Sequence, residues 1–268
     1  MIKKIVLVAV FFIFNNANSQ NKIIDTTKYK IVYNLIYQQD STNIASKREE
    51  KMLLLVGENY SLFQSENSRF NDSLVNYYTQ STKLDEQTAL NTMLSVKKKS
   101  RFNFKIRKSP NTMLAFDKIF SDKFIYKDEE KLNWKILNET KQINNYLCQK
   151  ATTHFGGRDY VAWFTSKIPI NDGPYKFRGL PGLIIKIQDT KKQYVFELLS
   201  LKKYNSSFSF DVKGIQMVTK KAYFKAYNDF KNNFIEQLEQ RGITFDKSNA
   251  NQVNQSIRKR RNNEIEID

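Results

Sequence analysis

The chain has 268 residues, with 44 lysines and arginines against 27 aspartates and glutamates, and its formal net charge is +17. It has one histidine, His154, and one cysteine, Cys148. This composition excludes zinc sites built from three or four cysteines and histidines, clusters ligated by several cysteines and a disulfide within the chain. Hydrophobic residues make up 40% of the chain, more than a disordered protein contains.

Residues 1–19 have the pattern of a secretory signal peptide. Two lysines precede an apolar run at residues 5–14, and the small residues Ala17 and Ser19 stand where a signal peptidase cleaves. The run is too short for a membrane span, which needs about 20 apolar residues. The sequence therefore predicts export to the periplasm, the outer membrane or the medium. We expect an exported basic protein to meet anionic lipids, polysaccharides or protein surfaces and no nucleic acid.

Residues 20–248 predict a single β-rich domain, because short alternating segments recur and no Pro/Gly/Ser-rich linker divides them. Residues 28–37 alternate, so that Ile31, Tyr33 and Leu35 share one face. A helix is predicted at residues 71–96. Further strands are predicted at residues 50–56, 60–65, 101–107, 113–120, 123–127, 134–137, 146–155, 159–166, 183–187 and 194–201.

Residues 219–241 predict one amphipathic helix, with Thr219 as its N-terminal cap and Gly242 just past its end. Its apolar stripe favours core packing over a ligand-binding surface. The members of this stripe are Tyr223, Tyr227, Phe230, Phe234 and Leu238. Residues 249–268 are polar and predict a frayed tail.

Many strands with few helices predict a mainly β, α+β fold. We expect a curved antiparallel sheet or a partly open barrel, with one or two helices packed across it. Such a sheet presents a concave face.

Residues 146–166 predict a hairpin around Gly156-Gly157, with Leu147 on the core face. On the opposite face, His154 lies beside Asp159, either as an ordinary cross-strand pair or as the start of a copper or zinc site. Cys148 shares that face, but six residues of strand place it about 20 Å from His154, too far for one ion.

Residues 173–182 hold three of the eight glycines and two of the four prolines, which fixes the backbone of an irregular loop. Gly173-Pro174 breaks regular structure. Pro181-Gly182 suits the centre of a type II turn, where proline presets the first residue and glycine accepts a positive φ.

This region resembles the GLPGLI family, which is named after a hexapeptide present here. The hexapeptide is Gly179, Leu180, Pro181, Gly182, Leu183 and Ile184, and similar surroundings extend over residues 134–189. Tyr175 stands where tryptophan is expected in that family. The resemblance implies an exported protein of Bacteroidota-type bacteria, often encoded near TonB-dependent outer-membrane receptors and linked to metal handling. It implies no catalytic residues.

The leading hypothesis is a non-enzymatic binding or accessory protein of the cell envelope that works with such a receptor. Its candidate ligand contacts are Trp163, Tyr175, Phe177 and Arg178, of which Arg178 suits an anionic group. In the alternative interpretation of this motif, Gly173, Pro174 and the hexapeptide form a rigid structural loop that caps the sheet.

Two other functions are carried as alternatives. One is periplasmic metal handling through His154 and Asp159, with copper or zinc. The other is an envelope-glycan hydrolase, which would need two of the carboxylates Asp159, Asp172 and Asp189 to lie within about 10 Å of each other.

Overall fold

The structure, a computed structural model, describes residues 22–80, 85–211, 214–242 and 247–267. The strands are β1 (Lys22–Gln38), β2 (Lys47–Gly57), β3 (Ser61–Ser65), β4 (Lys105–Ser109), β5 (Thr112–Ile119), β6 (Asp122–Asp128), β7 (Lys135–Ile143), β8 (Tyr146–Phe155), β9 (Arg158–Thr165), β10 (Leu183–Asp189), β11 (Tyr194–Asp211) and β12 (Gln216–Val218). The helices are η1 (Ile44–Ser46), α1 (Glu66–Gln80), α2 (Glu86–Val96), α3 (Lys220–Asn232), α4 (Phe234–Glu239) and α5 (Lys247–Arg260). The predicted signal peptide lies outside the described residues.

The twelve strands form one sheet in the order β12-β6-β5-β4-β3-β2-β1-β11-β10-β9-β8-β7. All neighbours are antiparallel except β12 and β6. The order ends at β12 and β7, so the sheet is open and does not close into a barrel. The predicted mainly β fold with a curved sheet is therefore confirmed. No helix in the described residues is long and apolar enough to cross a membrane.

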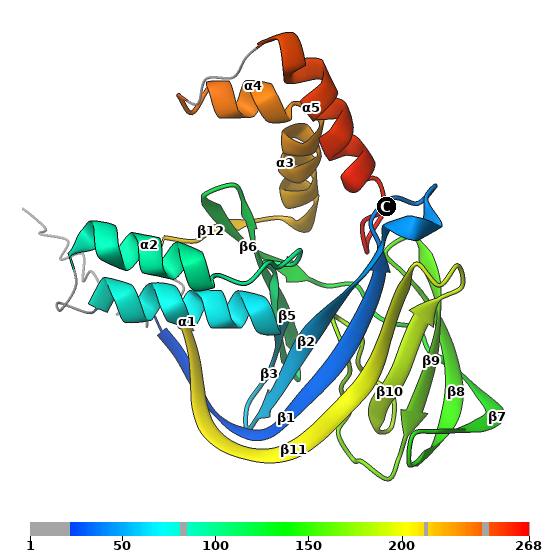
Figure 1. Ribbon diagram of the computed structural model, residues 1–268. Coiled ribbons are helices and arrows are strands. Elements are labelled where there is room, and N and C mark those ends of the chain that lie inside the picture. Colours follow the sequence, from blue (N-terminus) through cyan, green and yellow to red (C-terminus); the bar gives the residue numbers. More distant parts are fainter. Residues whose placement is uncertain (1–21, 81–84, 212–213, 243–246, 268) are drawn as a thin grey trace, which may run out of the picture.

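The long central strands β1 and β11 bend strongly, which gives the sheet its concave face (Figure 1). Register shifts at Thr27/Tyr29 and Val32/Tyr33 accompany this bend, as β-bulges do in curved sheets. The predicted alternation of β1 is confirmed, because Ile31, Tyr33 and Leu35 are each 0% exposed.

Both predicted helical regions form more than one helix. Residues 71–80 belong to α1 and residues 86–96 form α2, and residues 219–241 divide into α3 and α4 at Asn233, whose φ of −122° and ψ of 45° are not helical. The predicted cap is confirmed, because the Thr219 side chain accepts a hydrogen bond of 3.1 Å from the amide of Ala222.

The C-terminal region differs most from its predicted form. Residues 247–260 form α5, and the segment after it enters the core, where Asn263, Ile265 and Glu266 are 2%, 7% and 4% exposed. Polar composition predicts an exposed tail because isolated polar side chains prefer water. Here their partners are buried polar groups from distant parts of the chain, which the local sequence does not display.

Two local predictions need correction. The strand predicted at residues 101–107 begins at Lys105, although Phe102 and Phe104 before it are still buried. Leu147, predicted to face the core, is 53% exposed, and Cys148 is buried in its place. Burial raises the pKa of the Cys148 thiol to about 11, as for a cysteine that serves as a small apolar side chain.

Candidate ligand-binding site

The glycine- and proline-rich loop between β9 and β10 is packed inside the molecule. Leu180, Leu183 and Ile184 are at most 1% exposed. The predicted type II turn is wrong: the amide of Gly182 donates to the Leu180 carbonyl at 2.8 Å, which closes a three-residue γ-turn around Pro181. The amide of Leu183 is then free to donate to the Ile168 carbonyl at 3.1 Å, which ties the two ends of the loop together.

Two glycines allow this close packing. A Cβ atom on Gly182 would lie 2.1 Å from the carbonyl oxygen of Thr165, and the φ of Gly182 is +143°. A Cβ on Gly173 would lie 2.6 Å from Cδ1 of Ile184. These contacts favour the structural interpretation of the motif.

The same loop carries a buried lysine into a cluster of charges. Lys176 is 0% exposed, and its ammonium lies 2.5 Å from Asp128 Oδ2 and also contacts Glu266. Lys220 lies 2.8 Å from the other oxygen of Glu266. Burial alone would raise the pKa of Glu266, but the two ammonium groups outweigh it and lower that pKa. Lys220 also lies 2.9 Å from Glu130, so the cluster joins two cations to three carboxylates.

The four predicted ligand contacts do not converge on one surface. The Tyr175 hydroxyl donates to Glu266, and the buried Phe177 packs on the core ring of Tyr160 at 4.6 Å. Arg178 is half-buried and donates to a backbone carbonyl. Trp163 is half-buried on β9 between the buried Ala162 and Phe164, whose side chains point to the opposite face, and its ring lies 5.8 Å from the Lys150 ammonium.

His154 and Asp159 form the predicted cross-strand pair, with 2.8 Å between Nδ1 and Oδ1. Both side chains are exposed, at 65% and 72%. Within the described ranges, no group of three or more histidine, cysteine, aspartate or glutamate side chains is placed to hold a metal ion. A metal site would have to draw further ligands from elsewhere.

The three carboxylates of the hydrolase alternative lie in different environments. Asp172 pairs with Lys108 at 2.5 Å, and Asp189 pairs with Arg158 at 3.3 Å. The carbonyl of Asp172 accepts from the amide of Ile184 at one end of β10, whereas Asp189 ends that strand. A rise of about 3.3 Å per residue separates these two points by about 17 Å, too far for a catalytic carboxylate pair.

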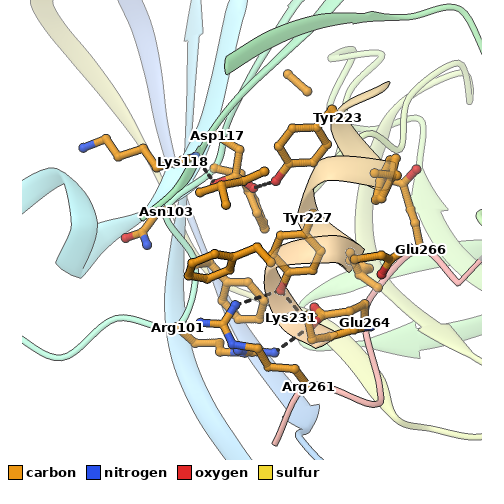
Figure 2. A pocket seen from close by; sticks show the side chains of 18 of the residues that line it. Arg101, Asn103, Asp117, Lys118, Tyr223, Tyr227, Lys231, Arg261, Glu264 and Glu266 are labelled. Atoms are coloured by element: carbon orange, nitrogen blue, oxygen red, sulfur yellow. Dashed lines mark hydrogen bonds and ion pairs between the residues drawn. The ribbon is translucent and has the colours of Figure 1, made fainter. Parts of the chain in front are cut away.

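A cavity of about 450 Å³ opens between the concave face of the sheet, α3 and the C-terminal segment (Figure 2). Its walls carry ten aromatic side chains: Phe102, Phe104, Phe120, Tyr126, Tyr175, Tyr223, Phe224, Tyr227, Phe230 and Phe234. The apolar stripe predicted on residues 219–241 therefore lines a cavity as well as packing on the core. Tyr223 and Tyr227 in that stripe were the sequence feature that could have indicated a cavity, because a buried tyrosine hydroxyl needs a hydrogen-bond partner that an entirely apolar core does not supply.

Charged groups also line the cavity. The Arg101 guanidinium lies 3.1 Å from Glu264, whose carboxylate accepts a hydrogen bond of 2.9 Å from the Tyr227 hydroxyl. Arg261 donates to the same hydroxyl at 2.8 Å (Figure 2). This chain of contacts joins the C-terminal segment to α3 and to the approach to β4. Sequence patterns could not show it, because its members come from residues 101, 227, 261 and 264.

Replacing Asp117 with asparagine should change how stability depends on pH. Asp117 lines the cavity, where burial raises the pKa of its carboxyl to about 6; the 2.7 Å hydrogen bond from Tyr223 opposes this shift only in part. A carboxyl whose pKa is raised by folding stabilises the fold below its unfolded pKa and loses that contribution as pH rises through the folded value.

We therefore expect the stability of the wild type, relative to the asparagine variant, to fall by about 1–3 kcal/mol between about pH 4 and pH 7. Urea unfolding at both pH values measures the difference. A relative stability that rises over this interval would show that Asp117 is ionised in the fold.

Comparison with known proteins gives a short sequence match and a similarity of fold. A family model described as "Protein of unknown function (Porph_ging)" matches residues 156–186, from the turn between β8 and β9 into β10. No curated protein matches the chain in sequence.

Among solved structures, PNGF-II in its P21 crystal form is similar, with a TM-score of 0.51 and 15% identity over 76% of this chain. The C2 form of PNGF-II gives a TM-score of 0.49 and 17% identity over 76% of this chain. The chain spans about a third of PNGF-II, 34% and 32% of the two structures. At this identity the similarity concerns the fold.

Proposed function

We propose that this chain is an exported binding protein of the bacterial cell envelope, of the GLPGLI type, which holds a small amphipathic anion in the cavity beside α3. The observation that carries the proposal is the cavity itself, at about 450 Å³ with aromatic walls and charged groups at its edge. Concave sites of about this size, in which polar and charged groups stand beside aromatic side chains, are where proteins bind small molecules.

The charges favour an anionic group on the ligand. Four cationic side chains line the cavity: Arg101, Lys118, Lys231 and Arg261. Three acidic residues also line it: Glu264 is engaged by Arg101, Glu266 by Lys176 and Lys220, and Asp117 accepts a hydrogen bond from the Tyr223 hydroxyl. Lys118 and Lys231 form no ion pair within the part of the chain that the structure describes. Of these two, Lys231 is the side chain better placed to meet a carboxylate or sulfonate, because Lys118 is exposed and points away from Tyr223 and Tyr227 (Figure 2).

The aromatic side chains in the walls favour a hydrophobic body on the same ligand. Rings from α3, from β6 and from the segment before β4 all line the cavity, so an apolar ligand would contact aromatic surface there. A partnership with a TonB-dependent receptor belongs to this proposal, as does a periplasmic or outer-membrane location. The support for both is the resemblance of residues 134–189 to the GLPGLI family.

Replacing Lys231 with alanine should weaken binding of anilinonaphthalene sulfonate, an amphipathic aryl sulfonate, by about threefold to tenfold. A half-buried charge-assisted contact contributes about 1 kcal/mol, which corresponds to that change in Kd. Fluorescence titration of the folded full chain measures it.

Lys225→Ala is the matched control, because Lys225 lies on the same helix but pairs with Asp229 on its exposed side. The Kd of this variant should equal that of the wild type. Equal weakening in both variants would mean that the dye responds to overall charge. If the wild type did not bind the dye, the proposal that the cavity binds an amphipathic anion would be contradicted.

A further inference from the structure

The C-terminal segment, residues 262–267, lies against the concave face without regular secondary structure. It adds no strand to the twelve-stranded sheet. Side chains hold its backbone instead: the Tyr194 hydroxyl donates to the Asn263 carbonyl at 2.7 Å, and Arg158 donates to the Glu264 carbonyl at 2.6 Å. The Tyr160 hydroxyl donates to the Ile265 carbonyl at 3.3 Å.

The side chains of this segment alternate between acidic and apolar, and the surrounding groove provides a cationic partner for each acid. Glu264 meets Arg101 at 3.1 Å, and Glu266 meets Lys176 and Lys220. Ile265 between them is 7% exposed. Recognition therefore uses carboxylates at alternate positions together with an apolar contact.

Gly156 makes room for the peptide. A Cβ atom there would lie 2.7 Å from Cγ of Glu266, and the Gly156 carbonyl accepts a 3.0 Å hydrogen bond from the amide of Ile267. The absence of a side chain at Gly156 therefore lets the peptide backbone pass close over the turn between β8 and β9.

We propose that this groove is a binding site for a short acidic peptide, which the chain's own C-terminal segment occupies. The electrostatics fix the ligand class: if the segment leaves, Lys176 and Arg101 lose carboxylates in buried surroundings, so a replacement must bring its own negative charges. This proposal does not depend on the small-molecule cavity, because it concerns the contacts beneath the segment.

The test uses the full chain with a recognition sequence for a specific protease inserted after Arg260, which is exposed and precedes the segment. The protein folds intact and is then cut. The probe is a fluorescent synthetic peptide, Asn-Asn-Glu-Ile-Glu-Ile-Asp, which repeats residues 262–268. Fluorescence anisotropy follows its exchange into the cut protein, and circular dichroism follows the fold.

We expect the cut protein to remain folded and to take up the peptide with a Kd of about 1 µM or tighter. A peptide with glutamine in place of both glutamates should bind at least about a hundredfold more weakly, because charge-assisted hydrogen bonds are lost. The uncut protein is the control and should take up little peptide, since its groove is filled.

Equal binding of the acidic and the glutamine peptides would overturn the proposal. So would unfolding of the cut protein when the segment is removed, because the segment would then be an integral part of the core. Failure of dye binding in the small-molecule experiment would leave both of these outcomes unaffected.

Discussion

The Lys176→Met variant should lose about 3–5 kcal/mol of the free energy of unfolding, the usual cost of removing one partner from a buried ion pair. Lys176 is 0% exposed and contacts two carboxylates, Asp128 and Glu266, which are both 1% exposed as side chains. In the variant these two anions would share only Lys220, which is 2.8 Å from one and 3.4 Å from the other. Urea unfolding followed by circular dichroism measures the loss.

The matched control is Lys225→Met, at an exposed lysine paired with Asp229 on α3. Exposed pairs of this kind contribute about 0.5 kcal/mol or less, so the control should unfold close to the wild type. A loss below about 1 kcal/mol for Lys176→Met would show that the cluster is not desolvated in solution.

The same cluster sets a direction for stability against pH. The pKa values of Asp128 and Glu266 are lowered in the fold, because attraction to the ammonium groups exceeds the effect of burial. Carboxyls of this kind stabilise the fold above their unfolded pKa, near 4, and lose that contribution as pH falls through the folded values. We therefore expect low pH to weaken the ion pair between Lys176 and Glu266 of the C-terminal segment, and with it the stability of the fold.

The Gly182→Ala variant should be destabilised by at least about 4 kcal/mol and should accumulate poorly as folded protein. The new Cβ atom would lie 2.1 Å from the Thr165 carbonyl oxygen, and the backbone at +143° disfavours every residue but glycine. The clashing atom belongs to the backbone at the end of β9, which cannot move away by a rotamer change as a side chain could. Thermal unfolding of the purified variant measures the change.

Gly179→Ala separates the two causes of this loss. Gly179 also has a positive φ, +100°, but the nearest atom to its Cβ would be 3.6 Å away, on Trp134. Only backbone strain remains there, at about 1–2 kcal/mol. If the two variants lost equal stability, the close packing of the loop against β9 would not matter.

The expected losses of stability in Gly182→Ala and Lys176→Met assign the glycine- and proline-rich motif a structural role. The C-terminal segment takes part in that role, because it packs against the same motif. The matched residues 156–186 include Gly156, where the C-terminal segment passes, and Lys176, which that segment neutralises. The block that matches the family model therefore depends on a partner about 90 residues away. The ligand contacts predicted at Trp163, Phe177 and Arg178 stay predictions, and Tyr175 alone among the four lines the cavity.

The sequence by itself determined most of the strands. The alternation in β1 and the hairpin around Gly156-Gly157 depend on local sterics and on the side-chain period of two, so they could be predicted without the fold. The cap at Thr219 is equally local, because it needs only a side-chain oxygen before a helix.

Tertiary structure alone decided the cavity and the fate of the C-terminal residues. The local sequence predicts that Glu264 and Glu266 are exposed to solvent, because it contains no buried cation that could pair with them. Their partners Arg101 and Lys176 lie 163 and 90 residues away and meet them only after the sheet has curved. A charged side chain can be buried only when the fold places an opposite charge beside it. The local sequence pattern does not show a partner that is distant along the chain.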